Sequence, residues 1–362
     1  MTATIRLARL EDEDGLQRLA RECPMAGGVT IRTEREPRFL ALNELQGTPS
    51  HVVVAVDAGR IVGSAAAAIR DVYVSGVPTR AAYLGDLRIA PDARGGTLLW
   101  RLHQRVADLI RDAGTDLAYT TIIDGNVAAG AMRGERRGMP RYRPLGRIRV
   151  CAISDARRTT TTRGIAVDRA RPDDRAEIAS LLDTFAARHE FAPVWTTARL
   201  AAALSSTPGL GIECFFIARE GGRIVGALAA WDQDALQRRR VLRYGARASA
   251  YRAIQALRAR ARHRPPLPAP GGLLRELHVT HIAVEGDRAE VFEALLHAAW
   301  DASAEGYHFL TFGLAEGHPL LRALRSFDHG AFHTVLHAVS WDGSRWTAHA
   351  FRGPLFHEIS HL

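Results

Sequence analysis

The chain has 362 residues, 47% of them hydrophobic, and a formal net charge of +9. This length predicts two domains, each with its own core, and the absence of any run of about eighteen apolar residues excludes a membrane-spanning helix. All 48 basic residues are arginine and they are scattered along the chain, so the positive charge indicates a solvated surface and gives only weak support for nucleic-acid binding.

The cysteines and the N-terminus bear on the compartment. Cys23, Cys151 and Cys214 are far apart in sequence and match no metal-binding or redox spacing. The first fifteen residues contain no apolar stretch of the kind found in secretory signals. A reducing cytoplasm is therefore the expected location.

The first half alternates strand-like and helix-like segments. Apolar alternation predicts strands, helical spacing of apolar residues predicts helices, and glycine or proline marks their ends. The predicted elements are a strand at 5–9, a helix at 11–23, a loop at 23–32, a short helix at 36–47, a hairpin at 51–76, a strand at 116–126, a short helix near 127–137 and a strand at 146–154.

Residues 83–105 are the most informative stretch of the first half. An apolar strand ends at Pro91, and the turn Arg94-Gly95-Gly96-Thr97 leads into a helix. Free N–H groups at the start of the helix, its dipole and the Arg94 charge all favour an anion at this turn. A phosphorylated cofactor is the natural ligand for such a turn.

The second half repeats this order after a polar linker at 155–163. The pentapeptide Gly-Arg-Ile-Val-Gly occurs at 59–63 and again at 222–226, each time within a predicted hairpin. We infer an internal duplication, with domains at 1–154 and 164–362. The second copy has an acidic turn, at 285–290, in place of the glycine turn, and an insertion at 234–272 that is rich in arginine.

The element order, the Arg-Gly-Gly turn and the following strand with Asn126 resemble the GNAT acyl-CoA N-acyltransferases. The resemblance covers nearly the whole chain and implies an α/β fold, with two GNAT-like domains in tandem. Each would be a mixed, mostly antiparallel sheet flanked by helices. The turn departs from the family pattern at Thr97-Leu98-Leu99, where a further small residue is usual.

The resemblance also implies a cofactor site, with acetyl-CoA or another acyl-CoA as co-substrate and no metal. The pyrophosphate would lie on the turn, the pantetheine arm along the strand edge, and Asn126 would hold the pantetheine. A backbone N–H near Ile89 would stabilise the oxyanion. Arg133 stands where the family often has a tyrosine acid, and would bind the thiolate or the 3′-phosphate. The expected cofactor-binding residues are Leu87, Arg88, Ile89, Arg94, Gly95, Gly96, Thr97, Leu98, Asn126 and Arg133.

Three residues are candidates for proton transfer during attack by a primary amine. Asp86 lies on the central strand as a general base, and the alternative is an aspartate ion-paired with Arg88 or Arg101. Tyr83 would line the acceptor pocket or relay protons, unless it belongs to the core. Tyr142 could replace the missing acid, or simply belong to a turn.

Two other features of the sequence have more than one interpretation. His357, Glu358 and His361 match the H-E-x-x-H zinc pattern, but 351–362 alternates like a closing strand, and the histidines of the second copy show no ligand spacing. The arginine-rich insertion is interpreted as an amphipathic helix over the second copy, as a dock for an acidic carrier protein, or as a nucleic-acid or membrane surface. Because no aromatic residues alternate with its arginines, nucleic-acid binding ranks last.

The predicted function is transfer of an acetyl or other acyl group from coenzyme A to a small-molecule amine, in the first copy. The alternatives are an acyl-CoA sensor or scaffold without turnover, and an acyltransferase that uses an acyl carrier protein. The acceptor itself is not encoded in the fold.

Overall fold

The computed structural model describes residues 3–126, 129, 138–157, 164–262, 264–303 and 306–361. Its first half follows the predicted order of elements and contains one additional strand, β2. The elements are β1 (Thr4–Leu7), η1 (Leu10–Asp12), α1 (Glu13–Glu22), β2 (Val29–Glu34), α2 (Ala41–Gln46), β3 (Ser50–Asp57), β4 (Arg60–Val74), β5 (Val77–Ile89), η2 (Pro91–Ala93), α3 (Leu98–Asp112), β6 (Ala118–Ile123) and β7 (Arg141–Ala156).

The second half repeats this order and adds the insertion, which forms β11 and α6. Its elements are β8 (Ala166–Arg169), η4 (Pro172–Asp174), α4 (Arg175–Ala186), α5 (Thr197–Ser206), η5 (Ile212–Cys214), β9 (Phe215–Glu220), β10 (Arg223–Asp232), β11 (Arg238–Tyr244), α6 (Ala246–Ala261), β12 (Leu273–Leu274), β13 (Glu276–Val284), η6 (Glu285–Asp287), α7 (Ala289–Ala302), β14 (Phe309–Ala315), η7 (Pro319–Ser326), β15 (Phe327–Ser340), η8 (Arg345–Thr347) and η9 (Ile359–His361).

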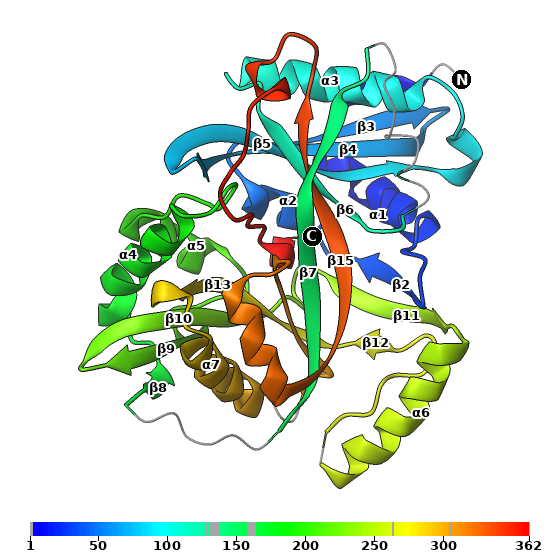
Figure 1. Cartoon of the computed structure of the whole chain (residues 1–362). Coiled ribbons are helices and arrows are strands. Elements are labelled where there is room, and N and C mark those ends of the chain that lie inside the picture. Colours follow the sequence, from blue (N-terminus) through cyan, green and yellow to red (C-terminus); the bar gives the residue numbers. More distant parts are fainter. Residues whose placement is uncertain are drawn as a thin grey trace.

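One twelve-stranded sheet runs through the described part of both halves. Its strand order is β1-β3-β4-β5-β6-β15-β7-β14-β13-β10-β9-β8. The last strands of the two halves are therefore exchanged, since β15 pairs with β6 and β7 pairs with β14. Figure 1 shows β7 and β15 as long strands that run between the part carrying α3 and the part carrying α7. The predicted domain limits divide the chain by sequence, whereas the sheet crosses them.

A second, three-stranded sheet also joins the halves. It has the order β12-β11-β2, so the insertion of the second half pairs with a strand of the first. The Arg240 guanidinium binds the Glu34 carboxylate through two contacts, of 2.7 and 2.9 Å. The prediction of a loop over 23–32 was wrong in its C-terminal part, because Val29 and its neighbours find their strand partner about 200 residues away.

The two glycines of the repeated pentapeptide have the same structural roles in both halves. Its first glycine makes the hairpin turn with a positive φ, +77° at Gly59 and +86° at Gly222, where other residues would be strained. Its second glycine lies under a helix. A Cβ at Gly63 would be 3.2 Å from Leu102 of α3, and one at Gly226 would be 2.6 Å from Val291 of α7. Close packing of helix on sheet therefore requires glycine at both positions.

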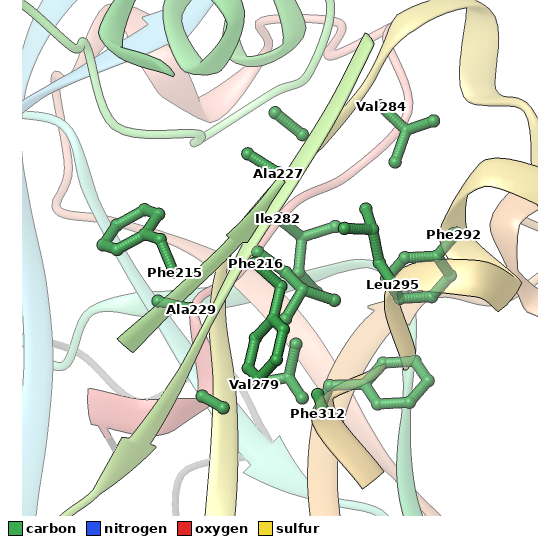
Figure 2. Close-up of a cluster of buried hydrophobic side chains, with 14 of the residues drawn as sticks. Phe215, Phe216, Ala227, Ala229, Val279, Ile282, Val284, Phe292, Leu295 and Phe312 are labelled. Carbon is green, nitrogen blue, oxygen red and sulfur yellow. The ribbon is translucent and has the colours of Figure 1, made fainter. Parts of the chain in front are cut away.

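Buried apolar side chains fill the space between the sheet and its helices. In the second half, Phe292 and Leu295 of α7 join Ile282 of β13 and Phe312 of β14 in one cluster (Figure 2). A second cluster lies between α3, α1 and the strands of the first half, and a third includes Tyr83 and Tyr119. These clusters hold β5 and α3, and hence the candidate site, in fixed positions.

The C-terminal segment does not form the strand predicted over 351–362. Its described residues follow an irregular path with a single bridge, between Leu355 and Glu190, and end in η9. The central positions of the sheet are already taken by β7 and β15, so this segment lies over the sheet, against α2, β13 and β14. The prediction of a closing strand was therefore wrong.

Candidate acyl-CoA site in the first half

The candidate site lies where β5 and β6 separate. These parallel strands pair only at Ala82 with Ala118 and Tyr83 with Tyr119. Just beyond, the β4–β5 register shifts between Ser64 and Ala66. Asp86 adopts a φ of +50°, and the Ser64 hydroxyl donates a 2.8 Å hydrogen bond to the Asp86 carbonyl. This bulge turns the rest of β5 away from β6 and opens an edge between them.

The open edge of β5 consists of backbone groups that β4 does not use. The Ala90 N–H donates to the Val62 carbonyl on the β4 side. Because successive N–H groups of a strand point to opposite sides, those of Ile89 and Leu87 point to the open edge. The Ile89 carbonyl accepts a hydrogen bond from the Arg94 side chain at 3.2 Å. An extended amide-containing ligand can pair with this edge as a further strand.

The glycine turn closes one end of this edge. Gly95 has a φ of +93°, and a Cβ at Gly95 or Gly96 would meet no atom within 4 Å, so the space in front of the turn is open. Thr97 caps α3 without a side-chain hydrogen bond, which leaves the first N–H groups of the helix available. Arg94 to Thr97 are exposed, whereas Leu98 is buried in the core and can contribute only its backbone N–H. The turn thus has the properties of an anion site.

Asp86 lies in a buried ion-pair network. Its carboxylate accepts hydrogen bonds from Arg35 at 2.6 Å, from Asn43 at 2.7 Å and from Arg88. The Asp86 and Arg35 side chains are only 5% and 4% exposed. Burial alone would raise the pKa of the Asp86 carboxyl, but Arg35 and Arg88 outweigh burial and hold this pKa below its usual range. The arrangement suits a residue that fixes the bulge better than one that accepts a proton.

The two tyrosine candidates lie on different sides of the sheet from each other. Tyr83 is buried beside Tyr119 and His357 in the third cluster, and burial raises its pKa to about 12. Tyr142 of β7 packs against the cluster beneath α3, and its hydroxyl lies 2.7 Å from His103 Nε2. Since His103 Nδ1 faces the Leu99 carbonyl at 2.8 Å, Nδ1 carries the proton and Tyr142 is the donor to Nε2. Both tyrosines have a structural partner.

Comparison with known proteins identifies the first half. Residues 4–126 match the family model described as an acetyltransferase (GNAT) domain. The first half is a GNAT domain. The resemblance drawn from the sequence is thereby confirmed, and the separated strands, the bulge and the glycine turn described above lie within the matched residues.

Solved structures share the fold over most of the chain. Saccharomyces cerevisiae N-myristoyltransferase with bound myristoyl-CoA aligns with a TM-score of 0.62 at 10% identity, over 93% of this chain and 83% of that one. A GCN5-related N-acetyltransferase from Sphaerobacter thermophilus aligns with a TM-score of 0.57 at 16% identity, over 93% and 95%. At these identities the likeness shows the fold alone, and it confirms the predicted tandem, mixed-sheet architecture. No curated protein matches the chain significantly.

Of the remaining predicted cofactor residues, all but Arg133 are described by the structure. Leu87, Arg88 and Ile89 line the open edge of the GNAT domain and are half-buried. Asn126 is exposed just after β6, the strand that borders the opening. Arg133 lies outside the described residues. The short helix predicted near 127–137 also lies outside them, except for residue 129.

The corresponding turn of the second half is acidic. Glu285 is held by Arg223 at 2.7 Å, and Asp287 is held by Arg188 at 2.9 Å. These carboxylates replace the open glycines of the first half and would repel a pyrophosphate. The described glycine turn of the GNAT domain is thus the better phosphate site of the two.

Sequence reasoning missed Arg35 and Asn43, which hold Asp86. They come from the segment around α2, 51 and 43 residues before Asp86 respectively, and no motif joins them to it. The only signal was the aspartate itself, since a carboxylate on a central strand requires a partner.

Among the described residues, two observations concern metal ligands and membrane-spanning helices. No group of three or more His, Cys, Asp or Glu side chains among them is arranged to hold a metal ion. His357 packs against Tyr83, and Glu358 accepts hydrogen bonds from protein groups. No described helix is long and apolar enough to cross a membrane.

Proposed function

We propose that the GNAT domain of the first half transfers an acyl group, most simply acetyl, from coenzyme A to a primary amine. The observation that carries the proposal is the opening between β5 and β6 with the exposed Arg94–Thr97 turn at its end. This geometry offers hydrogen-bond partners for the amides of pantetheine and N–H donors for its pyrophosphate.

The reaction would proceed by direct attack. The pantetheine arm would pair with the Leu87–Ile89 edge, which places the thioester carbonyl beside a backbone N–H of β5. That N–H would stabilise the negative charge that develops as the neutral amine attacks the carbonyl carbon. The C–S bond then breaks, and the leaving thiolate takes up the proton that the amine nitrogen releases. Asp86, with its pKa held low, acts in this proposal as a positioning residue that fixes the bulge, and much of the rate comes from holding both substrates in place.

Thiol release in the presence of amines tests the proposal. Acetyl-CoA is offered with a panel of amino acids, amino sugars and polyamines, and the free thiol is measured against hydrolysis without amine. Amine-dependent release that is lost in Arg94→Glu but kept in Arg111→Glu would support it. Arg111 is a matched control because it lies at the other end of the same 15-residue helix, about 20 Å away. Binding of acetyl-CoA without any amine-dependent release would favour the sensor or scaffold alternative.

A carrier protein as acyl donor is the second candidate, and α6 supports it. This helix projects beside the ends of β7 and β15 (Figure 1). Tyr251, Ile254 and Leu257 are 43%, 53% and 70% exposed on it, among several arginines. Exposed apolar residues within a positive field suit an acidic partner. Acyl transfer from an acidic carrier protein that is lost on replacing all three residues by serine, while transfer from acetyl-CoA continues, would establish this donor.

A further inference from the structure

A cavity of about 390 Å³ lies between the two halves, outside the acyl-CoA site. Its walls come from β4 and the end of α2 in the first half, and from α4, α5, β13 and the C-terminal segment in the second. Apolar side chains form much of the wall, including Ile69, Phe185, Trp195 and Phe356. A volume in this range, with apolar side chains in the wall and polar groups between them, is typical of small-molecule sites.

Two arginines without carboxylate partners give one part of the cavity a positive charge. Arg70 donates from Nε to the Tyr119 hydroxyl at 2.6 Å, and Arg199 donates to the Val194 carbonyl at 2.6 Å. Neither forms an ion pair with a described residue. Burial lowers the pKa of Arg199 and the charge of Arg70 lowers it further, whereas the exposed carboxylate of Asp71 offsets only part of these effects. An anion between them would relieve this repulsion.

His281 and Glu358 form the other polar part of the wall. His281 is 7% exposed and its Nε2 has no hydrogen-bond partner. Glu358 accepts hydrogen bonds from the His281 N–H at 3.2 Å and from the Ser360 hydroxyl at 3.0 Å. The proton of the His281 imidazole is assigned to Nδ1, which lies 3.0 Å from Thr280 Oγ1. His281 Nε2 is then a buried acceptor that requires a donor.

The duplication explains the position of His281. His281 has a φ of +53° at a register shift between β10 and β13, beyond the last β13–β14 pair at His278. Asp86 has a φ of +50° at the same point of the first half. The Asp86 side chain is fully paired, whereas His281 lines a cavity and keeps an unused acceptor. The second half has lost the phosphate turn but keeps a pocket at its own bulge.

We propose that this cavity, defined by Arg70, Arg199 and His281, binds an apolar carboxylic acid that also carries an ammonium or hydroxyl donor, such as an aromatic amino acid or hydroxy acid. The carboxylate lies between the two guanidinium groups, and the donor binds His281 Nε2 on the side of Glu358. The apolar body packs on Trp195 and Phe185. Three other charged residues line the cavity, Glu44, Asp71 and Arg80, and all are exposed, so water screens them.

Four probes that differ by single groups test this assignment by titration calorimetry on the full chain. L-phenylalanine and phenyllactate carry both a carboxylate and a donor, 3-phenylpropionate lacks the donor, and phenethylamine lacks the carboxylate. At least one of the first two is expected to bind saturably, and both incomplete probes at least about tenfold more weakly. Absence of saturable binding for all four probes in the millimolar range would overturn the proposal.

Variants assign the binding to the cavity. Arg199→Leu is expected to lower the affinity for the best-binding probe at least about tenfold. Arg199→Lys should lower this affinity less, and the distant Arg111→Leu should leave it unchanged. His281→Phe keeps a ring of similar size and should remove the preference for phenyllactate over 3-phenylpropionate. Equal affinity in the wild type and Arg199→Leu would overturn the assignment. A cooperative thermal transition retained in each variant shows that the chain remains folded, and this control is independent of the proposed acyl transfer.

Discussion

Replacing Asp86 by asparagine separates a positioning role from catalysis by this residue. The change keeps the size of the side chain but leaves Arg35, only 4% exposed, without its carboxylate at 2.6 Å. Breaking a buried ion pair by removing one partner costs about 3–5 kcal/mol. Because Arg35 still contacts Asn43 and asparagine still offers one oxygen, we expect the lower end, about 3 kcal/mol, and a Tm lowered by roughly 5 °C.

The assay is urea unfolding followed by tryptophan fluorescence, together with acetyl-CoA binding and thiol release. Asp92→Asn is the control, because Asp92 also pairs with an arginine, Arg60, but lies on the surface and should hardly change the midpoint. The pKa of Asp86 is depressed in the folded state, so its stabilisation is present above the unfolded pKa of about 4 and lost only below it. The stability difference between the wild type and Asp86→Asn should therefore be constant between pH 5 and 8.

One result would refute this reasoning. If Asp86→Asn were as stable as the wild type and still bound acetyl-CoA, but had lost amine-dependent thiol release, Asp86 would be the general base. A second variant adds a test of the network. Arg35→Gln combined with Asp86→Asn should cost less than the sum of the two single changes, because both remove the same interaction.

Three further outcomes are expected. In Gly226→Val, the first added carbon would lie 2.6 Å from Val291 Cγ1. The free energy of unfolding, measured with heat or urea, should therefore fall by about 1–3 kcal/mol. An unchanged midpoint would contradict the packing described. Burial lowers the pKa values of His281 and His318 to about 4, so stability should fall as pH drops from 6.5 to 4, by up to about 1.4 kcal/mol per pH unit for each histidine, and His318→Gln should flatten that fall. A chain ending after β7 lacks β15, the strand that covers β6, and should show no cooperative unfolding on its own; a sharp transition would show that the exchanged strand is dispensable.

The sequence was sufficient to predict those parts of the fold that depend on local patterns. The apolar spacing of α3, the glycine turn before it and the repeated pentapeptide are all encoded within a few residues. The duplication then made the element order of the second half readable from the first. These features predicted the family and the position of the exposed glycine turn before α3.

Features that depend on distant partners could not be predicted. The apolar pattern of β15 shows that it is a strand but not that it inserts between β6 and β7, because any strand offers the same backbone groups to its neighbours. The residues of β2 are all half-buried and lack a clear alternation, so its pairing with the arginine-rich β11 had no local signal. For the same reason, a carboxylate at position 86 was visible as a candidate, while its partners Arg35 and Asn43 were not.

His281 and Glu358 both line the proposed cavity, although the sequence patterns in which they stand did not predict it. Glu358 belongs to an H-E-x-x-H match, and in the structure its carboxylate accepts hydrogen bonds from protein groups. His281 belonged to a set of histidines interpreted as ordinary surface or core residues. Only the fold brings the two together, since the C-terminal segment lies across β13.

Titration of the full chain with acetyl-CoA in a calorimeter tests the central claim most directly. One binding site per chain is predicted, lost in Arg94→Glu and retained in Arg111→Glu, because only the first reverses the charge at the glycine turn. Unchanged affinity in Arg94→Glu, or two equivalent sites per chain, would contradict the assignment of the cofactor to the first half.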